Sequence, residues 1–192
     1  MKTCTSSTKD QSPNKQSNSH MKTKERLHHD TCVRVARLLK KGVKKGIPAL
    51  PLQAVELSDV TTGTSEAPDI IAYRHNISDA LCIVFEIKLS RADFLRDAKK
   101  VCRKKGCGMG AQRYYVTSEE LISPDEVPEG WGLLYLREKE LIMAKRSKIF
   151  PESERCTYGE TNTLLNLMRR GAKWGSLFDN DDHRGTHTNG QK

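Results

Sequence analysis

The chain has 192 residues, of which 36% are hydrophobic, and this suffices for one ordinary domain with a single core and terminal tails. No apolar run reaches the length of a membrane span, and the N-terminus lacks the apolar centre of a signal peptide, so we expect a cytoplasmic protein without a membrane partner. The six cysteines form no CxxC pair, which argues against a disulfide framework and against a zinc site.

The net charge of +9 is concentrated in two segments. Residues 22–45 and residues 88–113 each hold nine basic residues and two acids, so the rest of the chain is negative. This distribution suits a polyphosphate partner, because each neutralised phosphate releases a counterion. Two solvated helix faces would have the same composition, and charge alone leaves both interpretations open.

The first third of the chain predicts a tail, a helix and two strands. Residues 1–21 are polar and predict a disordered tail, and apolar side chains at helical spacing predict a helix over residues 23–41. Alternating apolar and polar residues predict strands over 52–60 and 68–73, which a polar loop joins.

A third strand is predicted over residues 81–89. Its period of two divides the side chains between an apolar face (Ile83, Phe85, Ile87, Leu89) and a second face (Cys82, Val84, Glu86, Lys88). Ser90 then caps a second helix together with Asp93. We expect this helix to expose a basic face and to bury an apolar stripe (Phe94, Leu95, Ala98, Val101, Cys102).

The remainder predicts a fourth strand over 113–117, a short helical turn over 118–122 capped by Thr117, and a hairpin made of "WGLLYL" and "ELIMAK". The order is therefore helix, three strands, helix and strand, followed by a hairpin, within a domain that spans residues 22–150. Residues 151–178 predict an extension with a short amphipathic helix, and residues 179–192 predict a second disordered tail.

Acidic and basic side chains in this order predict a candidate metal site. If the second and third strands pair, Asp69 lies beside Glu86, since cross-strand neighbours are about 5 Å apart. Two carboxylates offer the oxygen ligands that Mg²⁺ accepts, and the ion would activate water against a phosphodiester. Lys88 would orient that water or stabilise charge on the phosphate. The alternative is a Glu86–Lys88 pair that merely solvates a sheet face.

Pro68-Asp69 followed by Glu86-Ile87-Lys88 resembles the signature of the PD-(D/E)XK nuclease superfamily. The strings "EIKLSRADFLRDAKK", "GMGAQRYYVTSEELI" and "VPEGWGLLYL" are similar to a branch found in phage and bacterial proteins and related to the MmcB-like DNA-repair proteins. The resemblance covers about residues 53–136. It implies an α/β fold with a restriction-endonuclease-like core, in which helices flank a mixed β-sheet in the order αβββαβ.

The resemblance also implies roles for single residues. Asp69 and Glu86 match metal ligands, Lys88 matches the catalytic lysine, and Glu56 is an additional candidate ligand. Related proteins often carry another acid on the first helix, for which this chain offers Glu25 and Asp30, and the choice between them stays open. The expected contacts to nucleic acid come from the basic segment around the second helix and fourth strand (Arg91, Lys99, Lys100, Arg103, Arg113).

Three functional hypotheses follow from these observations, of which the third is a plain interaction protein with a solvated sheet face. The first is a deoxyribonuclease that uses Mg²⁺ or Mn²⁺ in DNA repair or phage DNA processing, in a bacterial or phage-infected cell. The second is a DNA-binding accessory module that has the same fold without useful catalysis. The preferred DNA structure, the choice between RNA and DNA, the mode of cleavage and the formation of a homodimer are left open.

Overall fold

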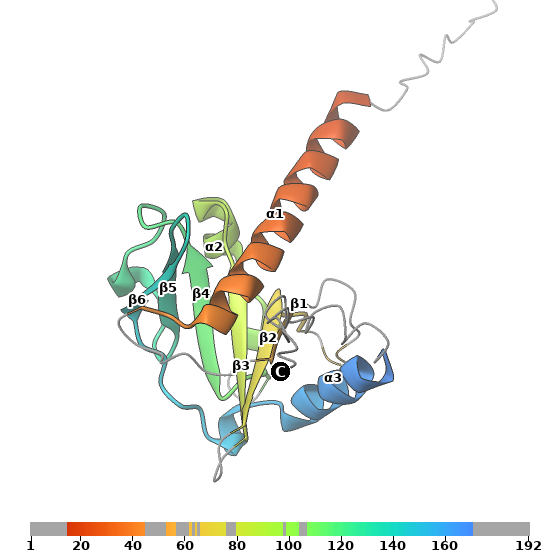
Figure 1. Cartoon of the computed structure of the whole chain (residues 1–192), viewed down its shortest axis with the longest axis vertical. Helices are drawn as coiled ribbons and strands as arrows, with labels where there is room; N and C mark the ends of the chain where they lie inside the picture. Colours follow the sequence, from red (N-terminus) through yellow and green to blue (C-terminus); the bar gives the residue numbers. More distant parts are fainter. Residues whose placement is uncertain are drawn as a thin grey trace, which may run out of the picture.

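The computed structural model contains one sheet of six strands that lie in chain order (Figure 1). It describes residues 15–44, 53–56, 62, 64, 66–75, 80–97, 99–103 and 107–170. The strands are β1 (Gln53–Glu56), β2 (Ile70–His75), β3 (Ala80–Ile87), β4 (Gln112–Thr117), β5 (Gly132–Leu136) and β6 (Leu141–Lys145). The pairs β3–β4 and β4–β5 are parallel, and the other three pairs are antiparallel. The predicted mixed sheet, its element order and the final hairpin are confirmed.

Helix α1 (Lys15–Lys41) covers one face of the sheet and extends well beyond its edge (Figure 1). Its buried side chains recur every three or four residues, as the sequence predicted, and they pack on the apolar face of β3 (Cys32, Val35, Ala36, Leu39, Ile83, Phe85, Ile87). The helix ends at Gly42, whose φ of 91° suits glycine at a helix C-terminus. It begins at Lys15, inside the segment predicted to be a tail, and residues 1–14 lie outside the described ones.

The opposite face carries two shorter helices, α2 (Arg91–Asp97) and α3 (Thr157–Arg169). Phe94 of α2 packs with Tyr115 and Trp131, and Leu167 of α3 packs with Val84. The second helix is shorter than predicted, because one turn of 3-10 helix over Val101–Arg103 follows it, with Cys102 buried. Leu95, which was expected in the buried stripe, is exposed.

Two further expectations are corrected. Residues 118–122 form a turn, as expected, but the hydroxyl of Thr117 donates to the carbonyl of Ser118 at 2.8 Å instead of capping this turn. The C-terminal helix begins at Thr157, five residues before the expected segment, "NTLLNLMRRGAKW". Among the described residues, none of the helices combines the length and the apolar character that a membrane crossing requires.

The register of the sheet positions the candidate site. In the β2–β3 pair Ile70 lies opposite Phe85, so Asp69, the residue before Ile70, comes next to Glu86. In the β1–β2 pair Ile70 lies opposite Glu56, and in the β3–β4 pair Glu86 lies opposite Tyr115. Three neighbouring strands, β1 to β3, thus bring the predicted acids into one region, close to the start of α2.

Candidate functional site

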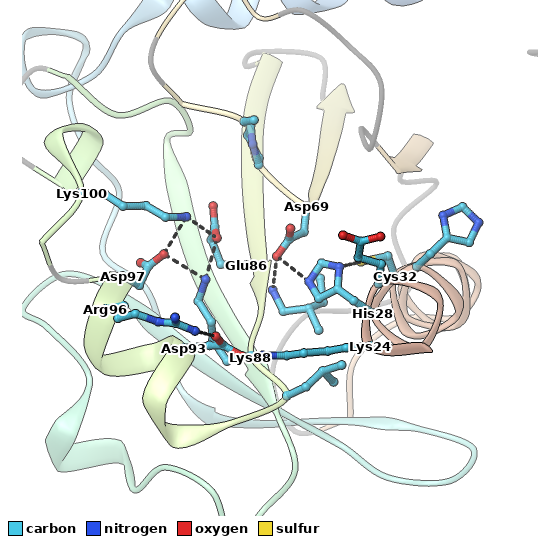
Figure 2. Close-up of a pocket in the computed structure, with 16 residues that line it drawn as sticks. Lys24, His28, Cys32, Asp69, Glu86, Lys88, Asp93, Arg96, Asp97 and Lys100 are labelled. Carbon is cyan, nitrogen blue, oxygen red and sulfur yellow. Dashed lines mark hydrogen bonds and ion pairs between the residues drawn. The ribbon is translucent and has the colours of Figure 1, made fainter. Parts of the chain in front are cut away.

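A pocket of about 620 Å³ lies between α1, the start of β2, the end of β3 and α2 (Figure 2). Asp69, Glu86 and Lys88, which the sequence predicted to form one site, all line it. Glu25 of α1 also lines this pocket, whereas Asp30 is not among its lining residues, so the structure favours Glu25 as the helical acid near the site. The three residues of the predicted trio therefore share one pocket, although Glu86 and Lys88 are themselves buried.

Asp69 is fixed at the edge of β3 by the main chain. Its Oδ2 accepts a hydrogen bond from the amide of Ile87 at 2.7 Å, where the carboxylate takes the place of a backbone acceptor just before β2 begins. The Nε2 atom of His28 lies 3.5 Å from the same oxygen, and its Nδ1 atom lies 3.7 Å from Sγ of Cys32. The Asp69 carboxylate, and after it Cys32, raises the pKa of His28 to about 10. At neutral pH His28 therefore holds a proton against Asp69.

Glu86 and Lys88 lie on the same face of β3, as their spacing requires, and both are buried. The side chain of Glu86 is 2% exposed and that of Lys88 is 7% exposed. Lys88 Nζ donates to Oε2 of Glu86 and to Oδ1 of Asp97, each at 2.9 Å. Each buried charge therefore has a partner, as it must if it is not to destabilise the fold.

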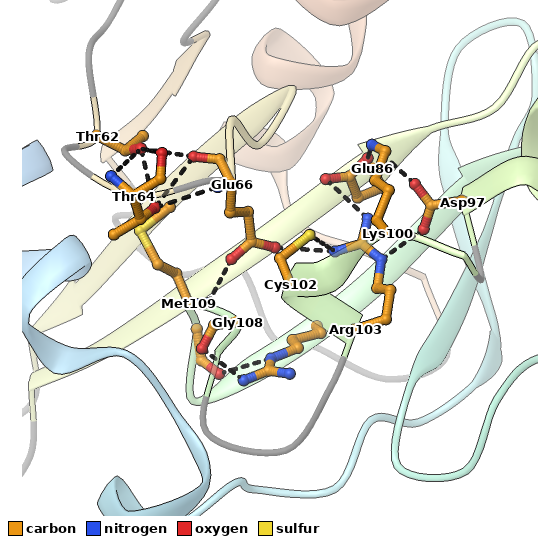
Figure 3. A network of polar contacts seen from close by, with 12 residues as sticks. Thr62, Thr64, Glu66, Glu86, Asp97, Lys100, Cys102, Arg103, Gly108 and Met109 are labelled. Atoms are coloured by element: carbon orange, nitrogen blue, oxygen red, sulfur yellow. Dashed lines mark hydrogen bonds and ion pairs between the residues drawn. The ribbon is translucent and has the colours of Figure 1, made fainter.

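Arg103 joins these groups into a larger cluster (Figure 3). Its Nε donates to Asp97 at 2.6 Å and its Nη1 to Glu66 at 2.9 Å, while its guanidinium lies 4.5 Å from the centre of the Trp131 ring. We call the resulting group the ionic cluster (Glu66, Glu86, Asp97, Lys88, Lys100, Arg103). It contains three acids and three bases among the described residues, so its formal charges balance.

The electrostatics of the ionic cluster favour the charged form of Asp97. Burial alone would raise the pKa of Asp97, but the hydrogen bond from Arg103 and the charge of Lys88 hold that pKa far below its usual range. Tyr115 adds a hydroxyl donor at 2.7 Å, and its own pKa is raised by burial and by this bond. Burial raises the pKa of Glu66, which the Met109 amide and Arg103 only partly oppose. Asp97 is thus a permanent anion at the centre of the ionic cluster.

Asp69 and Glu86 bring two carboxylates to the pocket. Glu86 Oε1 is buried and makes no hydrogen bond among the described residues, although Arg103 Nη2 lies 3.2 Å away in an unaligned ion pair. Carboxylate oxygens are the ligands that Mg²⁺ or Mn²⁺ accepts, and Glu86 could act as one by exchanging its present contacts with basic side chains. Glu56 occupies the predicted position in β1, but its side chain lies outside the described residues.

A second donor set lies beside the first. One ligand atom each from His28, Cys32 and Asp69 falls within 4.8 Å of the others. Figure 2 shows His28 and Cys32 of α1 on the Asp69 side of the pocket, while Asp97 and Lys100 lie beyond Glu86. Asp69 thus belongs to both sets.

The five residues predicted to contact nucleic acid are placed differently from one another. Lys99 and Lys100 are exposed, and Lys100 lines the pocket and lies 2.9 Å from Asp97. Arg91 is exposed but paired with Glu126. Arg103 and Arg113 are corrections, because both side chains are buried and engaged inside the protein.

The burial of Arg113 has a clear structural cause. Its guanidinium donates to the carbonyls of Gly108 and Gly110 and lies 4.3 Å from the centre of the Phe150 ring. A Cβ atom at Gly108 would lie 2.8 Å from Nη1 of Arg113, so only glycine permits this approach. Arg113 therefore secures the segment before β4 and is not presented to a ligand.

Three residues of the site were missed or underused by sequence reasoning. Glu66 lies in a segment that reads as a polar loop, and nothing local signals that its side chain is 1% exposed. Asp97 is three residues after the buried Phe94, a spacing that places both on one helix face and that signals burial. His28 precedes the buried Cys32 by one helical turn, so this spacing could also have predicted its position beside the core.

Comparisons with known proteins give the fold and no activity. No protein-family model matches the chain, and no curated protein matches it. The structure is similar to that of a protein of unknown function from Silicibacter pomeroyi, with a TM-score of 0.53 and 18% sequence identity over 79% of this chain and 92% of the other. The mixed sheet with its flanking helices is therefore an arrangement that this chain shares with a solved structure.

Proposed function

We propose that the protein is a metal-dependent DNA phosphodiester hydrolase with a restriction-endonuclease-like core of the PD-(D/E)XK type. The observation that carries the proposal is that Asp69, Glu86 and Lys88, chosen from sequence spacing, line one pocket. A chance signature would have no reason to converge in this way. The basic side chains at the same pocket, among them Lys24, Arg96 and Lys100, supply charge for a phosphate backbone.

Asp69 and Glu86 would hold Mg²⁺ or Mn²⁺. When bound, such an ion polarises the phosphodiester and lowers the pKa of an attacking water. Asp69 is already oriented by the Ile87 amide, so it needs no rearrangement to offer its second oxygen. Glu86 has to give up part of its contact with Lys88 and Lys100.

Lys88 keeps a partner when Glu86 becomes a ligand. Its ammonium also donates to Asp97, which remains ionised because Arg103 and Tyr115 hold it. Asp97 therefore positions Lys88 at the pocket, where the ammonium can orient a water or stabilise charge that develops on the phosphate. We assign Asp97 as a positioning residue for this reason.

Cleavage assays with matched variants test the proposal. Purified protein is incubated with single-stranded, duplex and branched DNA in Mg²⁺ or Mn²⁺, alongside Asp69→Asn, Lys88→Met and the control Asp30→Asn, which alters an exposed acid of α1 away from the pocket. We expect cleavage by wild type and by the control, and loss in both site variants. Cleavage that survives Asp69→Asn and Lys88→Met would show that the activity resides elsewhere.

A second candidate is a DNA-binding accessory module without catalysis. The observation in its favour is that Lys88 and Arg103 already neutralise Glu86 and Asp97 inside the protein, so the ionic cluster is complete without a metal. This function predicts salt-dependent DNA binding that is indifferent to divalent cations. Calorimetric titration with Mn²⁺ separates the two, because a functioning carboxylate pair binds Mn²⁺ and loses it in Asp69→Asn.

A further inference from the structure

We propose that His28, Cys32 and Asp69 form a binding site for a thiophilic divalent cation of the Zn²⁺ class, distinct from the all-oxygen pair of Asp69 and Glu86. The proposal goes beyond the nuclease function and does not depend on it. It rests on the donor types, on their separations and on their position at the pocket.

The separations fit a tetrahedral ion. Cys32 and His28 are four residues apart on α1 and so lie on one face, with Sγ 3.7 Å from Nδ1. Ligand bonds of about 2.3 Å to sulfur and about 2.0 Å to nitrogen give a sulfur-to-nitrogen edge of about 3.6 Å in a tetrahedral site. The thiol and imidazole therefore already stand at the separation that a shared ion requires.

Asp69 completes the set from the sheet. All three ligand atoms lie within 4.8 Å of one another, so each separation has to close by at most about 1.5 Å to reach a tetrahedral edge. Nδ1 of His28 now faces Cys32 and Nε2 faces Asp69, so ligation through one nitrogen gives up the contact of the other, which the bound ion replaces. Three protein ligands leave a fourth position for water on the pocket side, as in open zinc sites.

The donor types select the ion. Thiolate and imidazole prefer Zn²⁺, Co²⁺ and similar ions, whereas Mg²⁺ prefers carboxylate and water oxygens. Cys32 is 2% exposed yet lines the pocket, so the thiol is protected from bulk solvent while an ion has a route to it. The two donor sets that share Asp69 would thus bind different ions. The set with His28 and Cys32 would prefer softer cations, and the pair with Glu86 would prefer hard ones.

Titration with Co²⁺ tests the site directly, because a thiolate bound to Co²⁺ produces a charge-transfer absorption band that oxygen ligands do not give. The full chain is titrated with Co²⁺ in a phosphine reductant at about pH 8, where the ion displaces the protons that the His28 imidazole and the Cys32 thiol still hold. We expect one equivalent to bind with this band, and Zn²⁺ to displace it. We expect Cys32→Ser to abolish the band, and His28→Gln and Asp69→Asn to weaken binding by about tenfold or more.

Matched controls separate this site from the other thiols. Cys107→Ser and Cys156→Ser alter partly exposed cysteines outside the cluster and should keep the band. Because Cys32 lies in the core, Cys32→Ala and circular dichroism check that the loss is not caused by unfolding, while His28→Gln changes a half-exposed residue. Absence of a band in wild type, or a band that persists in a folded Cys32 variant, would overturn the proposal.

Discussion

Charged side chains are buried on one side of the pocket and partly exposed on the other. On the α2 side, the ionic cluster holds Glu86 and Lys88 almost without solvent, and each has a partner within the protein. On the α1 side, Asp69 and His28 are partly exposed, with side chains 21% and 38% accessible, and they meet across 3.5 Å. The first arrangement is costly to break, whereas the second is open to solvent, which replaces a lost contact there at lower cost.

This difference indicates how a cation would reach the site. Removing one partner of a buried pair leaves the other charge uncompensated. In a solvent-exposed pair, water takes the place of the missing partner. Asp69 is therefore the more accessible of the two carboxylates that would hold a cation, and Glu86 would have to exchange its contact with Lys88. The ionic cluster keeps Lys88 and Asp97 in place while the Asp69 side changes its ligands.

Arg103→Leu should produce the largest effect, because it leaves Glu66, Glu86 and Asp97 buried with fewer cations. We expect unfolding free energy to fall by about 3 to 5 kcal/mol, as for other broken buried ion pairs. The matched control is Arg96→Leu, whose exposed pair with Asp93 should contribute less than about 1 kcal/mol. Urea unfolding measures both, and equal losses in the two variants would contradict a special role for the ionic cluster.

The two carboxylates of the proposed metal pair should respond differently to neutralisation. Glu86→Gln removes a buried charge that faces Lys88, Lys100 and Arg103, so we expect a loss of about 3 kcal/mol in stability. Asp69→Asn keeps an oxygen for the Ile87 amide and loses only a partly exposed contact, so its cost should stay below about 1 kcal/mol.

Urea unfolding of both variants at neutral pH decides this comparison. Because Asp69→Asn should fold normally, any loss of Mn²⁺ binding or cleavage in it reports the site directly. A loss of stability in Asp69→Asn as large as in Glu86→Gln would mean that the two sides of the pocket do not differ as described.

Competition between Zn²⁺ and Mn²⁺ should change the free energy of Mn²⁺ binding by less than the buried-charge variants change stability. Since Asp69 belongs to both donor sets, one equivalent of Zn²⁺ should weaken Mn²⁺ binding at the Asp69–Glu86 pair several-fold, in the range of about 1 kcal/mol. The effect should disappear in Cys32→Ser, which keeps Asp69. Calorimetric Mn²⁺ titrations with and without Zn²⁺ measure it, and undiminished competition in Cys32→Ser would place the Zn²⁺ elsewhere.

Local patterns were sufficient to predict the elements and the Asp69–Glu86–Lys88 trio. The faces of β3 follow from its period of two, and the register beside Asp69 follows from antiparallel pairing of neighbouring strands. These features depend on residues close in sequence, or on the simplest pairing of consecutive strands.

Features that depend on distant contacts could not be predicted in the same way. Arg103 is buried because Glu66, 37 residues earlier, and Trp131, 28 residues later, both meet it, and no local pattern distinguishes it from the exposed Lys99. Leu95 shows the reverse case, since α2 ends after two turns and leaves part of its apolar pattern unpartnered. Net charge along the sequence therefore overstated the basic surface by two arginines, Arg103 and Arg113.

Ser90→Ala should produce the smallest effect, at the rim of the pocket. The hydroxyl of Ser90 donates to Asp93 at 2.7 Å and, as the largest contribution, lowers the pKa of Asp93 to about 2. A lowered pKa stabilises the folded state at pH values above the unfolded pKa of about 3.9, and this stabilisation is lost as pH falls toward 2.

Nuclear magnetic resonance titration of Asp93 should show its pKa rising toward the ordinary value in Ser90→Ala. Stability at neutral pH should fall by about 1 kcal/mol, as for other lost helix caps. An unchanged Asp93 pKa would mean that Arg96 and Lys24 alone hold this carboxylate at the rim, and that the cap contributes nothing to the charge that faces a ligand.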